Sequence, residues 1–132
     1  MSDHAAVETV YHLITKPQWE SFGEVYTPPT YEQDGFVHLT AERADALRVG
    51  NHFCKTVKED FVLLTVSIPA LADVRPLLKW EAAAAVGNTA AHAAGDYPHL
   101  YAPLPRAAIT ATAQIERDAD GTFLAIADDV PM

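Results

Sequence analysis

Hydrophobic and polar positions alternate with period two in several stretches of the chain, and this alternation predicts β-strands. The clearest is 60–68, where apolar residues occupy every even position from 62 to 68 and Pro69 ends the run. The stretch 109–116 alternates apolar with polar residues, as expected of an antiparallel strand with one solvated face. The stretch 7–14 has apolar residues on both faces, which predicts a central strand. Shorter runs predict strands at 36–39, 78–81 and 123–126, the last behind a hairpin turn at 118–121.

Two stretches carry helix signals. Thr15 stands three residues before Gln18, which is the spacing of a capping box, and a short helix should follow as far as Gly23. Thr40 is expected to cap a second helix that continues to about Val57. Along this second helix the three- and four-residue spacing predicts a buried stripe, formed by Ala46, Val49, Phe53 and Val57.

These elements predict an α+β fold, a bent and mostly antiparallel split sheet with two or three short helices. The length fits one domain over residues 1–132, in which residues 1–6 are expected to be frayed. Residues 82–96 are rich in alanine, which favours helix but buries little surface. We expect a flexible insertion there, and the sequence leaves open whether it is a loose helix or a mobile flap.

Charge and composition exclude several classes of function. The formal charge is −9 and no two of the nine basic residues are adjacent, so binding to a nucleic acid is not expected. No apolar run is long enough to span a membrane, and the N-terminus lacks the features of a signal peptide. The single cysteine allows no internal disulfide, which favours a cytoplasmic location. A small-molecule ligand is the expected partner, and the sequence does not decide whether a protein partner exists.

Two histidines interrupt the apolar strands. His12 lies in the first predicted strand beside Tyr11, and His38 lies in the second, two residues after Phe36. A buried imidazole nitrogen without a partner costs about 1–3 kcal/mol, so a lone strand histidine is usually held by structural hydrogen bonds. Two of them on successive strands, each with an aromatic neighbour, favour a shared pocket.

Two further segments carry candidate groups. Glu81 follows Trp80 at the end of a short strand, where a carboxylate can act as a general base, accept from a sugar hydroxyl, or simply be solvated. The stretch 98–104 is bounded by prolines and is expected to be a stiff loop that holds His99 and Tyr101 in fixed directions. Bracing the edge of a sheet is the alternative role for this loop.

Other kinds of site lack a local signature. The chain has no glycine-rich phosphate loop, no His-x-x-x-His pair and no Cys-x-x-Cys pair. Cys54 lies on the apolar side of the second helix and is expected to belong to the core. No metal is expected, although a divalent ion on His12, His38 and His99 stays an alternative because distant residues can converge.

A set of motifs occurs in one order along the chain: Tyr11–His12–Leu13, Trp19, GFVHLT at 35–40, Leu63–Leu64, Trp80–Glu81 and YPHLYAPL at 97–104. Taken together, these motifs resemble the bacterial family called domain of unknown function 952, DUF952, over nearly the whole chain. There are two departures from the family pattern, because Tyr97 replaces a phenylalanine and Ala102 replaces a glycine. The second would matter if the glycine needed a positive φ or let a ligand approach the backbone.

The resemblance also implies a function. DUF952 has no established activity, but its motifs are remotely similar to the ADP-ribosyltransferase superfold, a split sheet that clamps NAD. This similarity implies an NAD-utilising ADP-ribosyl or related ribosyl-transfer enzyme, with NAD as the substrate and Glu81 and His38 as catalytic residues. The ligand-binding residues would be His12, Tyr11, Thr40, His99 and Tyr101. Two alternatives remain, a non-catalytic domain that binds a nucleotide-like metabolite and a histidine-based metal-binding protein.

Overall fold

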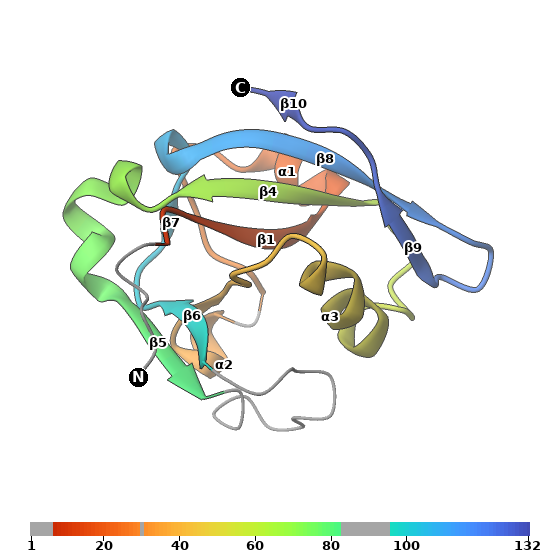
Figure 1. The fold of residues 1–132 in the computed structure, drawn as a ribbon, viewed down its shortest axis with the longest axis horizontal. Coiled ribbons are helices and arrows are strands. Elements are labelled where there is room, and N and C mark those ends of the chain that lie inside the picture. The colour runs from red at the N-terminus through yellow and green to blue at the C-terminus, as the bar shows by residue number, and fades with distance from the viewer. Residues whose placement is uncertain (1–6, 30, 83–95) are drawn as a thin grey trace.

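The main sheet is antiparallel and curves over the rest of the molecule (Figure 1). The computed structural model describes residues 7–29, 31–82 and 96–132. The strand order is β1 (Thr9–Thr15), β4 (Phe61–Ser67), β8 (Ile109–Arg117) and β10 (Val130–Pro131), and β9 (Phe123–Ile126) also pairs with β8. β1 pairs with β4 over its whole length, from Thr9 opposite Ser67 to Thr15 opposite Phe61.

A second, smaller sheet lies beside the first, and its strand order is β3 (Val37–His38), β6 (Asp96–Leu100) and β5 (Leu78–Ala82). A further antiparallel pair joins β2 (Val25–Tyr26) to β7 (Leu104–Pro105). One isolated bridge, between Tyr11 and Thr40, connects β1 to the segment that follows β3. The predicted α+β class with a bent, split, mostly antiparallel sheet is confirmed.

The helices are short: α1 (Lys16–Ser21), α2 (Tyr31–Asp34), α3 (Asp45–Phe53) and the 3₁₀ segments η2 (Pro69–Leu77) and η4 (Arg106–Ala108). α1 begins as predicted, because the Thr15 hydroxyl accepts from the backbone N–H of Gln18 at 3.4 Å. No helix among the described residues is both long and apolar enough to cross a membrane.

The predicted bounds of the second helix were wrong at both ends. α3 begins at Asp45, because the backbone of Thr40 is already paired with Tyr11 by two hydrogen bonds of 2.8 and 2.9 Å. It ends at Phe53, not at Val57, and Cys54 is its C-cap. The expected buried stripe was also wrong in part, since the Phe53 side chain is exposed and Cys54 is only partly buried.

β4, and not β1, is the central strand. Successive residues of β4 point to opposite faces, so Val62, Leu64 and Val66 enter one apolar cluster while Phe61 and Leu63 enter another. The first cluster includes residues of β1, β3, β6 and the segment after β6, and the second lies between the sheet and α3. β1 is apolar on both faces although it lies at one edge of the main sheet, because other segments cover it.

The expected stiff loop at 98–104 was also wrong in its first part. Pro98, His99 and Leu100 belong to β6, which pairs with β5 on one side and β3 on the other. Pro98 lacks an N–H, but its carbonyl accepts from Leu39 at 3.1 Å. Ala102 is buried and does not have a positive φ, which among the described non-glycine residues occurs at Ala72. The predicted frayed end at 1–6 and residues 83–95 of the predicted insertion lie outside the described residues.

Candidate functional site

The two sheets separate at His12. Tyr11 bonds to Thr40 through both its N–H and its C=O, so the odd residues of β1 direct their backbone groups away from β4. If the antiparallel pairing of Tyr11 with Thr40 continued along β1, the next hydrogen-bonded pair would be Leu13 and His38. Instead, the carbonyl of His38 lies 2.7 Å from Nδ1 of His12 and accepts its proton. The imidazole therefore takes the place of the next ladder bond, and the N–H and C=O of Leu13 bond to no other described residue.

A cavity of about 410 Å³ lies along this open edge of β1. This volume falls within the roughly 300–1,000 Å³ of typical small-molecule sites. α3 contributes Ala46, Val49 and Phe53 to the lining of the cavity. The lining also includes residues of other segments, among them Tyr26, Pro28, Pro29, Asp34 and His38. The helix face that was predicted to be a buried stripe is thus a cavity wall.

Two residues that line this cavity each carry a buried polar atom without a partner among the described residues, Nε2 in His12 and the hydroxyl oxygen in Thr40. Because Nδ1 of His12 donates to a carbonyl, Nε2 carries the free lone pair of the neutral ring. Burial lowers the pKa of His12 to about 4, since a second N–H would be buried without an acceptor. Two residues that line the cavity therefore carry a neutral acceptor and an unsatisfied hydroxyl, and both atoms are buried.

A carboxylate–histidine pair, Asp34 and His38, also lines the cavity. Asp34 ends α2, and Gly35, with φ of +82°, reverses the chain so that Asp34 Oδ2 lies 2.7 Å from Nε2 of His38. A carboxylate only accepts, so Nε2 carries the proton and donates it. The ring of His38 also packs on Phe36, with centroids 4.6 Å apart, and on His99 at 5.5 Å. These contacts fix the direction of the His38 imidazole.

A separate cluster contacts the ring of His38 through His99, and it consists of Glu81, His99 and Tyr101. Glu81 Oε1 accepts from Nδ1 of His99 at 2.8 Å and from the Tyr101 hydroxyl at 2.6 Å. The bond from Tyr101 has the larger effect on the pKa of Glu81 and the bond from His99 the next, and both lower it. The bond to Glu81 in turn raises the pKa of Tyr101. Burial lowers the pKa of His99, although its bond to Glu81 opposes this shift. His99 stacks on Phe36 at 4.2 Å, so Phe36 joins the cluster to His38.

The structure brings together all seven residues that the sequence pointed to, but not around one cavity. Tyr11, His12, His38 and Thr40 line it, whereas Glu81, His99 and Tyr101 do not. His99 is only 1% exposed, so it supports its neighbours instead of facing the ligand space.

Sequence reasoning missed Asp34 and the backbone of Leu13. The four-residue spacing of Asp34 and His38 across Gly35 was a readable signal for the first. No local signal existed for Leu13, because its unpaired backbone depends on where two sheets separate.

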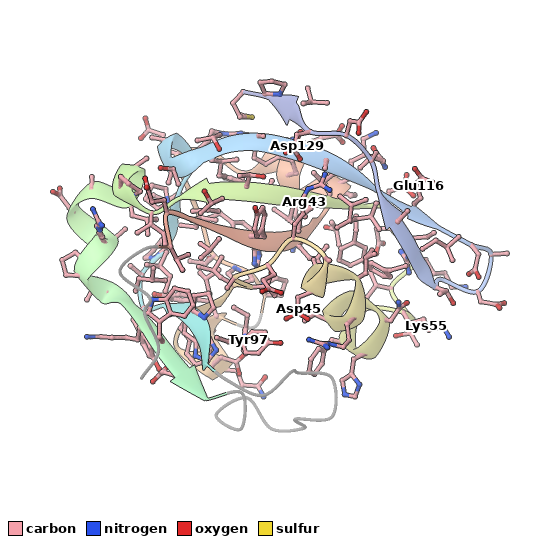
Figure 2. The ribbon with its side chains drawn as sticks, in the orientation of Figure 1. Arg43, Asp45, Lys55, Tyr97, Glu116 and Asp129 are labelled. Atoms are coloured by element: carbon pink, nitrogen blue, oxygen red, sulfur yellow. The ribbon has the colours of Figure 1, made fainter. Side chains whose placement is uncertain are left out.

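The rim of the cavity includes a further polar group. The Tyr97 hydroxyl donates to Asp45 Oδ2 at 2.6 Å, and Arg48 pairs with the other oxygen of Asp45. Figure 2 shows that this link joins α3 to β6. Tyr97, where the family pattern has a phenylalanine, thus contributes a hydrogen bond that phenylalanine lacks.

The metal alternative has no support from the described residues. No group of three histidine, cysteine, aspartate or glutamate side chains in the described part of the chain is placed to hold a metal ion.

Comparisons with known proteins extend these observations. The family model described as "Protein of unknown function (DUF952)" matches residues 13–112. The crystal structure of protein CC0527 from Caulobacter crescentus is similar, with a TM-score of 0.68 and 27% identity over 88% of this chain and 93% of that chain. The solution NMR structure of CC0527 has a TM-score of 0.61 and 26% identity over 86% and 89% of the two chains. No curated protein matches the chain.

Proposed function

Because this chain belongs to DUF952, a family of proteins of unknown function, we propose its activity from the site: it binds NAD in the cavity on β1 and transfers the ADP-ribosyl group. The observation that carries the proposal is that two residues lining one cavity, His12 and Thr40, each carry a buried and unpartnered polar atom, Nε2 and Oγ1. Buried polar groups are nearly always paired in native proteins, so two unpartnered groups beside one cavity support the proposal that a ligand completes their hydrogen bonds.

The backbone of Leu13 fits one end of this substrate. A primary carboxamide has one acceptor oxygen and an NH₂ donor, and the N–H and C=O of Leu13 are directed together to the open edge of β1. Nicotinamide carries such a carboxamide, and the ribose beside it carries hydroxyls that would donate to Nε2 of His12 once the bound ligand uncovers that buried atom. The apolar side chains of the cavity suit a flat aromatic ring.

The reaction would take place beside His38. The bond between C1′ of the ribose and the ring nitrogen breaks, and nicotinamide leaves with the electron pair. Positive charge then develops on the sugar, and a nearby carboxylate stabilises it. Glu81 supplies a carboxylate that its hydrogen bonds keep ionised, although the substrate must extend from the cavity past His38 to reach it.

Thermal unfolding with NAD, ADP-ribose and nicotinamide tests the proposal. A ligand at a hundredfold its dissociation constant stabilises the folded state by about 2.7 kcal/mol. We expect NAD to raise the melting temperature of the unmodified protein and of the control His52→Phe, whose position is exposed, but not of His12→Phe. Equal shifts in all three proteins, or none with millimolar NAD, would rule out the cavity as an NAD site.

One observation favours a second candidate, a non-catalytic domain that binds a nucleotide-like metabolite. Glu81 Oε1 is occupied by both His99 and Tyr101, and Glu81 does not line the cavity. Glu81→Gln separates the candidates. An enzyme retains NAD binding in this variant but loses release of nicotinamide, whereas a binding domain releases no nicotinamide in either form.

A further inference from the structure

The three histidines of the site differ in their ability to exchange a proton with a bound molecule. Nε2 of His12 is buried, and a pKa of about 4 keeps the ring neutral. His99 is 1% exposed and its Nδ1 is held by Glu81. The side chain of His38 is 36% exposed and lines the cavity, so it alone of the three is both accessible and next to the ligand space.

Asp34 determines which nitrogen of His38 is available. Its Oδ2 lies 2.7 Å from Nε2, so the neutral ring carries its proton on Nε2 and a lone pair on Nδ1. No described residue bonds to Nδ1. The ring cannot easily turn, because Phe36 and His99 pack against it.

We propose that Asp34 is a positioning residue that orients His38 as the general base for a hydroxyl acceptor, and this inference rests on the proposed function. Nδ1 of His38 takes the proton of the acceptor O–H, the acceptor oxygen bonds to C1′ of the ribose, and the C1′–N bond breaks with its electron pair leaving on nicotinamide. Histidine suits this role, because its ordinary pKa lies near neutral pH. The acceptor is a neutral alcohol or water, since an acceptor carboxylate would be repelled by Asp34.

Asp34→Asn tests the role of the carboxylate, and Glu32→Gln is the matched control because it removes a charge from an exposed position of the same helix. The asparagine amide can donate to Nε2, which moves the proton to Nδ1 and removes the base. We expect Asp34→Asn to lower the kcat of nicotinamide release by on the order of 10²–10⁴-fold, with KM for NAD changed less than about threefold. Glu32→Gln should match the unmodified protein.

Two further measurements test the tautomer of His38 and the hydroxyl acceptor directly. Nitrogen-15 NMR of the imidazoles should show the Nε2–H form of His38 in the unmodified protein and in Glu32→Gln, and its loss in Asp34→Asn. Methanol, added as a hydroxyl probe, should yield methyl ADP-ribose at the expense of ADP-ribose in the unmodified protein.

The possible failures are distinguishable. Nicotinamide release that is equal in Asp34→Asn and Glu32→Gln overturns the role of Asp34 and leaves the proposed function standing. A His38 ring that carries its proton on Nδ1 in the unmodified protein overturns the inference in the same way. Absence of NAD cleavage by the unmodified protein overturns both, even if the Nε2–H form is observed.

Discussion

Two regions of the molecule bury polar groups. In one region these groups are hydrogen-bonded, and in the other they have no partner among the described residues. At the end of β8, Arg117 donates to five backbone carbonyls, those of Cys54, Lys55, Val57, Glu59 and Gly121. Its guanidinium also lies over the rings of Phe61 and Phe123, at 5.3 and 4.6 Å. On the cavity, by contrast, Nε2 of His12 and the hydroxyl of Thr40 have no partner among the described residues.

This difference separates polar groups that stabilise the fold from polar groups that are candidates for binding a ligand. Four of the hydrogen bonds of Arg117 hold the segment after α3 against the end of β8, the fifth reaches Gly121 in the turn between β8 and β9, and Arg117 does not line the cavity. Satisfied polar groups of this kind stabilise the folded state. Unsatisfied buried polar atoms lower stability, and His12 and Thr40, which line the cavity, each carry one.

Loss of the Arg117 guanidinium should have the largest effect on stability. We expect Arg117→Met to lower the free energy of unfolding by about 3–4 kcal/mol, because several carbonyls lose a charged donor at once. Arg75→Met, at an exposed position, should change it by less than about 0.5 kcal/mol. Urea unfolding measures both. A loss below 1 kcal/mol in Arg117→Met would show that the two regions do not differ as described.

Acidification should lower the free energy of unfolding mainly through His12, which lines the cavity. The folded-state pKa of His12, about 4, lies below the ordinary 6.5, so the unfolded chain binds more protons between these values. Stability from this group is therefore complete above pH 6.5 and is lost as the pH falls towards 4, by at most about 3 kcal/mol.

His12→Phe isolates this effect. We expect the free energy of unfolding, measured by urea titration at several pH values, to decline less steeply in the variant than in the unmodified protein. The remaining decline includes the contributions of His99 and Glu81, whose folded pKa values are also lowered. Parallel pH curves for the two proteins would contradict the assignment of a buried neutral His12.

The smallest expected effect has the opposite sign. Thr40→Val keeps the shape of the side chain and removes an unsatisfied hydroxyl, so it should raise the free energy of unfolding by about 1 kcal/mol. Thr65→Val is a matched control, because its buried hydroxyl is also unpartnered but lies away from the cavity. Both should be stabilised in urea unfolding, and only Thr40→Val should weaken NAD binding in calorimetry. Destabilisation of Thr40→Val would mean that the hydroxyl is satisfied within the protein.

Local patterns were sufficient for most strands and for one helix start. The alternation at 60–68 and 109–116 predicted β4 and β8, and the Thr15–Gln18 spacing predicted the start of α1. The interpretations that failed depended on partners far along the chain. Thr40 has the chemistry of a helix cap, but Tyr11 occupies its backbone, and a proline-bounded stretch became β6 because β3 and β5 flank it.

The sequence by itself determined which groups could do chemistry, because two histidines in apolar strands must either find partners or face a cavity. Only the tertiary structure decided which of them does. It engages His99 with Glu81, leaves Nε2 of His12 unpartnered on the cavity, and brings Asp34 against His38. The physical reason is that pairing between strands and the point where they separate depend on contacts across the whole chain, which no local pattern encodes.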